Sequence, residues 1–148
     1  MTRNINTAGL NLIKHFEGCE LTAYQDVAGL WTIGWGHRGG VIPGTTWTQA
    51  EANEVLRADL TSTEAAVERA VAGVETTDDQ FAAMVSLAYN IGTGAFASST
   101  VLRQHRAGDI ESAADAFLLW DKATIDGVLQ VVKGLANRRH AERTLYLT

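Results

Sequence analysis

The sequence predicts an α+β fold in which a small, strongly turned antiparallel sheet lies at one end and a bundle of helices at the other. Five glycines recur among short apolar runs between residues 21 and 42, a pattern typical of short strands joined by tight turns. Two capping boxes, at residues 48–51 and 77–80, each mark the start of a helix. A chain of 148 residues has the right length for one such domain.

The first predicted helix covers residues 7–18, where Thr7 is the expected cap and Gly18 the expected stop. The sheet follows, and the capping box at residue 48 then opens a second helix that runs to about residue 71. Its length suits a connector between two lobes, with a break near residues 61–63 left open as an alternative.

The second capping box opens a helix that is apolar on nearly all sides, which indicates a buried central element. Gly92 and Gly94 are expected to stop it. The short stretch Ser98-Ser99-Thr100 can cap the next helix. Further helices are predicted over residues 99–106, 109–120 and about 134–146, and residues 121–134 remain ambiguous.

Composition excludes several classes of function. Twelve basic residues against 17 acidic ones give a formal net charge of −5, which argues against a nucleic-acid binder. No apolar run is long enough for a signal peptide or a membrane span, so we expect synthesis in a cytoplasm and no stable membrane insertion. The one cysteine, Cys19, forms no internal disulfide. The basic cluster at residues 133–143 makes the last helix the likelier face for an anionic ligand.

The candidate catalytic residues are Glu17, Asp26 and Thr32, which lie close together after the first helix. The negative end of the helix dipole and apolar neighbours favour a protonated Glu17, as a general acid requires. Each residue alone has an ordinary explanation: an exposed helix end, a turn aspartate and a strand hydroxyl. Together they suit the carboxylate pair of a retaining or inverting glycosidase, with a hydroxyl that holds water.

The four histidines and Cys19 show no metal-ligand spacing, so no metal site and no cofactor are expected. We interpret His37 as the partner of a carboxylate in a structural bridge. Cys19 is best explained as a small residue near the site, because a nucleophilic role needs an activating partner.

These residues resemble the signature of the phage-type lysozymes (glycoside hydrolase family 24). That signature is Glu-x8-Asp-x5-Thr followed by Thr-x-Gly-x-Gly-His, and here the tail reads Thr32-Ile33-Gly34-Trp35-Gly36-His37. The resemblance continues in family order through the end of the central helix and into the last helix, and so covers nearly the whole chain. The later matching segments are Ala88-Tyr89-Asn90-Ile91-Gly92, Phe96 to Leu102, Ala113 to Trp120, and Arg138-Arg139-x-x-Glu142.

The resemblance implies a two-lobed lysozyme fold of one domain, residues 1–148, with a small lobe at about 14–60 and a helical lobe at about 1–13 and 72–148. It implies cleavage of the β-1,4 bond between N-acetylmuramic acid and N-acetylglucosamine in peptidoglycan, with inversion. Glu17 would be the general acid, while Asp26 and Thr32 would position the attacking water. An inverting geometry places the two carboxyl groups about 6.5–9.5 Å apart.

The resemblance also assigns supporting roles. His37 would bridge Asp59 across the small lobe, and Arg138 or Arg139 would approach Glu17. The remaining expected substrate-binding residues along the cleft are Tyr89, Asn90, Ser99 and Thr100.

Two alternatives stay open: a lytic transglycosylase, and a wall-binding module without activity. We expect a monomer that reaches the wall through a membrane pore formed by a phage holin. Many relatives are basic, so the acidic charge predicts weak activity on intact cells.

Overall fold

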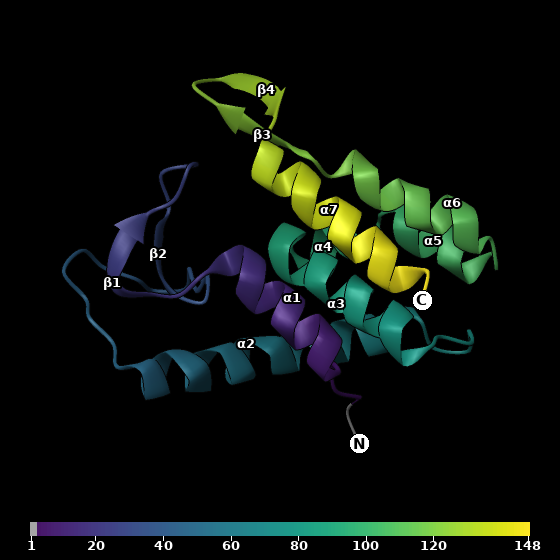
Figure 1. Ribbon diagram of the computed structural model, residues 1–148, viewed down its shortest axis with the longest axis horizontal. Helices are drawn as coiled ribbons and strands as arrows, with labels where there is room; N and C mark the ends of the chain where they lie inside the picture. The colour runs from purple at the N-terminus through teal and green to yellow at the C-terminus, as the bar shows by residue number, and fades with distance from the viewer. Residues whose placement is uncertain (1–2) are drawn as a thin grey trace.

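The computed structural model describes residues 3–148, and in these residues the chain forms seven α-helices and two small antiparallel sheets. The sheet of β1 and β2 lies at one end, and α2 runs from that end along the edge of the helical bundle (Figure 1). The sheet of β3 and β4 projects beyond the start of α7 (Figure 1). The predicted α+β arrangement is therefore confirmed, with one extra hairpin.

Helix α1, Thr7–Glu17, ends at the candidate acid. Its cap is Asn6 rather than Thr7, because Asn6 has an extended backbone and its side-chain oxygen accepts from the N–H of Gly9. Gly18 ends the helix as predicted, with a positive φ of 65° and its N–H bonded to the Lys14 carbonyl. Glu17 is consequently the last helical residue.

Strands β1, Glu20–Gln25, and β2, Trp31–Gly34, pair in antiparallel register. Tyr24 lies opposite Thr32, and a register shift separates this part of the ladder from the pairing at Glu20. The chain then returns beside β1, where the N–H of Trp47 bonds to the Leu21 carbonyl at 2.8 Å. The five-residue connection between the strands carries Asp26.

Helix α2, Gln49–Ala70, is unbroken. Both hydrogen bonds of the predicted capping box at Thr48 are present. The break considered near residues 61–63 does not occur, because the three hydroxyls there donate to backbone carbonyls of the preceding turn. Side chains bonded in this way can remain inside a helix.

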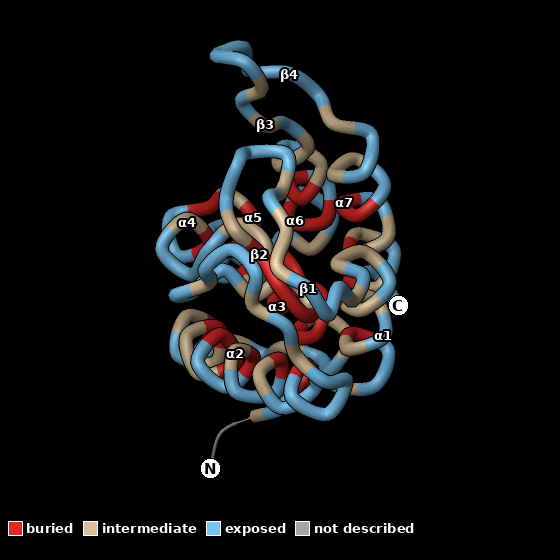
Figure 2. The backbone as a smooth tube through the Cα atoms, turned by 90° about the vertical axis from the view of Figure 1, so that its left-hand side faces the viewer, coloured by how far each residue is buried: buried red, intermediate tan, exposed pale blue. Residues whose placement is uncertain are grey.

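Helix α3, Asp78–Ile91, is the centre of the bundle, and residues 81–88 are all buried (Figure 2). It packs against α1, α2 and α7. Gly92, with φ of 96°, ends it as predicted. The second expected stop, Gly94, instead lies inside a short helix α4, Thr93–Ala97, so that prediction is wrong. One glycine with a positive φ is enough to end α3, and Gly92 is that residue.

The remaining helices are α5, Thr100–Arg106, α6, Ile110–Ala116, and α7, Lys133–Tyr146. A 3-10 turn, Phe117–Leu119, follows α6 and shortens the helix that the sequence predicted through residue 120. None of the helices in residues 3–148 is both long and apolar enough to cross a membrane.

The ambiguous segment 121–134 contains the hairpin of β3, Lys122–Ile125, and β4, Val128–Val131. Its two turn residues, Asp126 and Gly127, both have positive φ angles, 51° and 76°. Asp-Gly favours this two-residue turn, so this dipeptide was the signal that could have identified the hairpin.

Candidate active site

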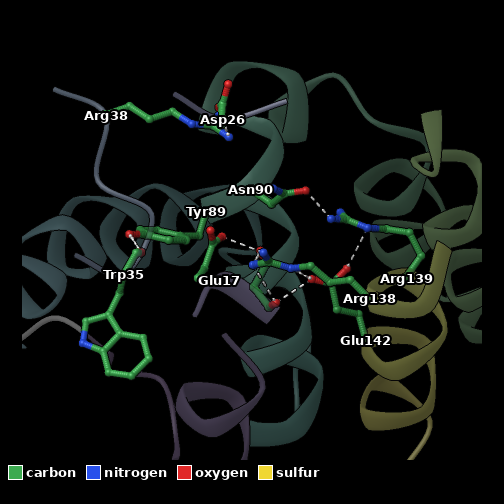
Figure 3. A network of polar contacts seen from close by, with 10 residues as sticks. Glu17, Asp26, Trp35, Arg38, Tyr89, Asn90, Arg138, Arg139 and Glu142 are labelled. Carbon is green, nitrogen blue, oxygen red and sulfur yellow. Dashed lines mark hydrogen bonds and ion pairs between the residues drawn. The ribbon is translucent and has the colours of Figure 1, made fainter. Parts of the chain in front are cut away.

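Glu17 is held by an arginine from the far end of the chain. The Nη1 of Arg138 donates to Glu17 Oε2 at 2.6 Å, and the two side chains are only 4% and 14% exposed (Figure 3). The sequence indicated apolar neighbours for this carboxyl, whereas its closest partner is a guanidinium. Of the two arginines considered, Arg138 is the one that contacts Glu17.

Close backbone packing leaves Glu17 little space on its other side. A Cβ at Gly36 would lie 2.3 Å from Glu17 Oε1, so no other residue fits there without moving the carboxyl. Gly36 also has φ of 83°, which favours glycine. The adjoining carbonyl of Trp35 accepts from the Tyr89 hydroxyl at 2.9 Å. Burial, and then the charge of Glu17, raise the pKa of Tyr89, which keeps it a hydrogen-bond donor.

The two oxygens of Asp26 have different surroundings. Oδ1 accepts from the backbone N–H groups of Ala28 and Leu30, both at 2.9 Å. Oδ2 lies 3.1 Å from Nη2 of Arg38 in an ion pair, yet it is buried and has no hydrogen-bond partner. The turn thus fixes one oxygen and leaves the other free to accept a proton or a hydrogen bond.

Thr32 is tied to Asp26 through Leu30. The Thr32 hydroxyl donates to the Leu30 carbonyl at 3.0 Å, and the same carbonyl accepts from the Asp26 N–H at 2.9 Å. Thr32 is only 2% exposed. Because its proton is already used, its oxygen can act toward water only as an acceptor.

Two cavities meet at Glu17, and both are lined by Glu17, Arg38 and Asn90. The first, about 390 Å³, extends past Tyr89 and the loop at residues 36–39 after β2, which we call the sheet-side loop. The second, about 490 Å³, extends past Asp26 toward the base of the β3–β4 hairpin. Glu17 and Asp26 therefore face one common cavity. Thr32 is not among the lining residues of either cavity.

Arg138 belongs to a buried network between α3 and α7 (Figure 3). Its Nε lies 3.2 Å from Glu142, and its Nη2 donates to the Ser86 carbonyl at 3.1 Å. The Ser86 hydroxyl donates to Glu142 at 2.5 Å. Burial alone lowers the pKa of Arg138, but Glu17 and Glu142 outweigh it and the pKa is raised. Arg138 thus stays charged beside Glu17.

Arg139 faces the other side of the same network. It is fully buried, donates to the Asn90 side chain and lies 3.4 Å from Glu142. Burial raises the pKa of Glu142, while Arg139 and Arg138 oppose that shift. The basic cluster of the last helix is therefore not the anion-binding face that the sequence suggested, since its two central arginines point into the protein.

Comparison with known proteins identifies the family. The Phage lysozyme family profile matches residues 14–142, which is most of the chain. The chain belongs to the phage lysozyme family. It is 42% identical to the endolysin of Salmonella phage P22 over 149 residues, which cover 97% of this chain and 98% of that one. It is 43% identical to the endolysin of Bacillus phage B103, but it spans only 54% of that longer protein.

Solved structures give the same result. An endolysin from Escherichia coli O157:H7 phage FAHEc1 superposes with a TM-score of 0.90 at 40% identity, covering 98% of this chain and 94% of that one. The muramidase domain of SpmX from Asticaccaulis excentricus has a TM-score of 0.88 at 39% identity, with 99% of each chain covered. The two-lobed α+β lysozyme fold and the assignment to the lysozyme class of glycoside hydrolases are confirmed.

The structure brings some of the expected supporting residues of this lysozyme to the cavities. His37 Nδ1 lies 2.7 Å from Asp59, in the bridge that the resemblance implies. Ser99 caps α5 and is buried, and the Thr100 hydroxyl accepts from Arg103. Neither of these two lines the cavities at Glu17.

Sequence reasoning did not identify Arg38, and it named Glu142 in the matching motif without giving it a role. Glu142 lies three and four positions after the arginine pair, a helical spacing that favours ion pairs and could have identified it. Arg38 directly follows the glycine-rich tail and has no local signal of its own. Within residues 3–148, no three His, Cys, Asp or Glu side chains are grouped as a metal would require.

Proposed function

We propose that this muramidase hydrolyses the β-1,4 bond between N-acetylmuramic acid and N-acetylglucosamine with inversion at the anomeric carbon. One observation carries the proposal: Glu17 and Asp26, which come from different elements, line the same cavity. Their side chains have different partners. Glu17 is bound by a guanidinium, and Asp26 keeps one buried oxygen without a hydrogen bond. Such a pair divides acid and base roles between two carboxyl groups.

Glu17 acts as the general acid toward the leaving oxygen. Arg138 occupies its Oε2, so the transferred proton is carried on Oε1, the oxygen next to Gly36. After transfer, the carboxylate is left beside Arg138, which stabilises the charge that has formed. A positioned acid of this kind contributes about 10²–10⁴-fold to the rate.

Asp26 and Thr32 hold the attacking water. Such a water donates one hydrogen to Asp26 Oδ2 and the other to Thr32 Oγ1, whose own proton is used by Leu30. Both hydrogens are then engaged, and a lone pair of the water oxygen is directed at the anomeric carbon. Asp26 takes one proton as the bond to carbon forms, which completes an inverting displacement.

Tyr89, Asn90 and Arg138 would contact the glycan or orient the acid, since all three line the cavities at Glu17. The same proposal includes a monomer that is made in the bacterial cytoplasm and reaches the wall after a holin has permeabilised the membrane.

The Glu17→Gln variant tests the acid, because glutamine has the same shape but cannot donate that proton. Release of reducing ends from purified peptidoglycan should fall by at least about 10²-fold. Glu20→Gln is the matched control, since Glu20 lies on β1, is exposed and has no assigned role, so its activity should be unchanged. Retained activity in Glu17→Gln would refute the assignment.

Product analysis of the unaltered enzyme tests the reaction itself. Hydrolysis with inversion gives reducing ends whose first-formed anomer is α, detectable by NMR before mutarotation. A first-formed β anomer would contradict inversion. Products with 1,6-anhydro ends would instead indicate a lytic transglycosylase, and binding to the wall without any product would indicate a module that lacks activity.

A further inference from the structure

Arg38 lies in the sheet-side loop, where hydrogen bonds of the neighbouring residues hold the backbone. The preceding residue, His37, exchanges two backbone hydrogen bonds of 2.9 Å with Ile33. The His37 ring bonds to Asp59 on one side and to the Gly39 carbonyl, at 2.8 Å, on the other. The backbone on both sides of Arg38 is therefore anchored, and the side chain extends from this anchor toward the turn that carries Asp26 (Figure 3).

The contact between Arg38 and Asp26 joins an accessible cation to a largely buried carboxylate. Arg38 is 47% exposed, whereas Asp26 is only 11% exposed. Their ion pair, at 3.1 Å, is made to Oδ2, the oxygen that no hydrogen bond holds. The turn already holds Oδ1 through two N–H groups, so Arg38 is the group that acts on the other end of the carboxylate.

Arg38 also lies where the glycan must pass. It lines both cavities, as do Glu17 and Asn90. A residue in this place can either help the reaction by orienting Asp26 or obstruct the cleft. The ion pair favours the first, because the attraction between Arg38 and Oδ2 opposes rotation of the Asp26 carboxylate.

We propose that Arg38 is a positioning residue for catalysis, which acts through Asp26 by holding Oδ2 in the orientation that accepts a hydrogen bond from the attacking water. The inference rests on the proposed function, because it needs Asp26 to be the group that takes the proton from water. An orientation error of about 1 Å at such a group can cost about 100-fold in rate.

The first experiment compares Arg38→Ala with the unaltered enzyme on soluble peptidoglycan fragments. We expect kcat to fall about 10- to 100-fold with little change in KM, since the lost interaction serves the chemical step. Arg38→Lys should recover most of the rate, because the contact is an ion pair through one nitrogen rather than a bidentate hydrogen-bonded fork. Arg143→Ala removes an arginine of similar exposure, which pairs with an exposed aspartate away from the cavities, and should leave kcat unchanged. A rise in kcat or a fall in KM for Arg38→Ala would overturn the proposal and indicate an obstruction.

Chemical rescue separates positioning from a purely structural role. Because Arg38 is half exposed, free guanidinium ion can enter the space that Arg38→Ala leaves. Millimolar guanidinium chloride should raise the kcat of Arg38→Ala, while the same concentration of sodium chloride should not, and Arg143→Ala should not respond. Absence of rescue, with the variant still folded by circular dichroism, would count against the proposal.

A double-mutant cycle with Asp26→Asn tests whether Arg38 acts through Asp26. In the Asp26→Asn background, adding Arg38→Ala should change the residual rate by less than about twofold. An equal loss in both backgrounds would overturn the inference. If Asp26→Asn alone keeps the full rate, the proposed function fails instead, so the two failures are distinguishable.

Discussion

Glu142→Gln is the substitution whose cost can be worked out most directly from the structure. Glu142 is fully buried and lies between Arg138 and Arg139, which are 3% and 0% exposed. Both guanidiniums contact the Glu142 carboxylate, and Arg138 also contacts Glu17. Replacing Glu142 by glutamine keeps the shape but removes the carboxylate that both buried guanidiniums contact.

Removing one partner of a buried ion pair costs about 3–5 kcal/mol, because the remaining charge is left without compensation. Glutamine can still accept from the Ser86 hydroxyl, so we expect the lower end, about 3 kcal/mol. For a chain of this length each kcal/mol corresponds to about 2–4 °C, which gives a fall in Tm of about 6–12 °C.

Urea unfolding followed by far-UV circular dichroism at neutral pH measures this loss. Asp115→Asn is the control on the same surface of the bundle, because it removes the exposed partner of Arg143 and should cost less than about 1 kcal/mol. Arg139→Gln combined with Glu142→Gln restores charge balance and should be more stable than Glu142→Gln alone. A cost below about 1 kcal/mol for Glu142→Gln would refute the reasoning.

Two further predictions follow from single contacts. Gly36→Ala should lower activity more than about tenfold, because its Cβ would displace the Glu17 carboxyl. Gly44 has a similar φ of 85° but lies in open space, so Gly44→Ala should retain activity. Equal losses in the two variants would contradict this prediction. Burial, and then Arg106, lower the pKa of His105, so its contribution to stability is present above about pH 6.5 and is lost as the pH falls through its folded-state pKa. Urea unfolding of His105→Gln should lack this acid loss, and an unchanged pH dependence would contradict the assignment.

Local signals explain why much of the fold could be predicted from the sequence. The capping boxes at Thr48 and Thr77 use side chains three residues apart, so the whole motif can be recognised in a short segment of sequence. The first helix was assigned the wrong cap because Asn6 and Thr7 are both good caps and only the backbone angles distinguish them. The β3–β4 hairpin was missed because its strands have four residues each and β4 is exposed throughout, with no alternation of polar and apolar residues.

Part of the candidate site could likewise be predicted from local spacing, and part of it could not. Glu17, Asp26 and Thr32 lie in one short stretch, so their grouping was accessible from spacing. The choice between Arg138 and Arg139 was not, because neighbouring residues on a helix point about 100° apart. Which of them faces Glu17 depends on how α7 is rotated against α3, and that is decided by packing between distant segments. Arg38 was missed for a similar reason, since its partner belongs to another turn.

The two carboxyl groups of the site are therefore supported by different parts of the molecule. Glu17 is held by Arg138, whose own position depends on Ser86 and Glu142 in the helical bundle. Asp26 is held by its own turn and by Arg38 from the sheet-side loop. An inverting reaction needs a fixed gap for water between acid and base. In the proposed mechanism separate supports can keep that gap, because a change in the α3–α7 packing moves Arg138, the partner of Glu17, without disturbing the turn that holds Asp26.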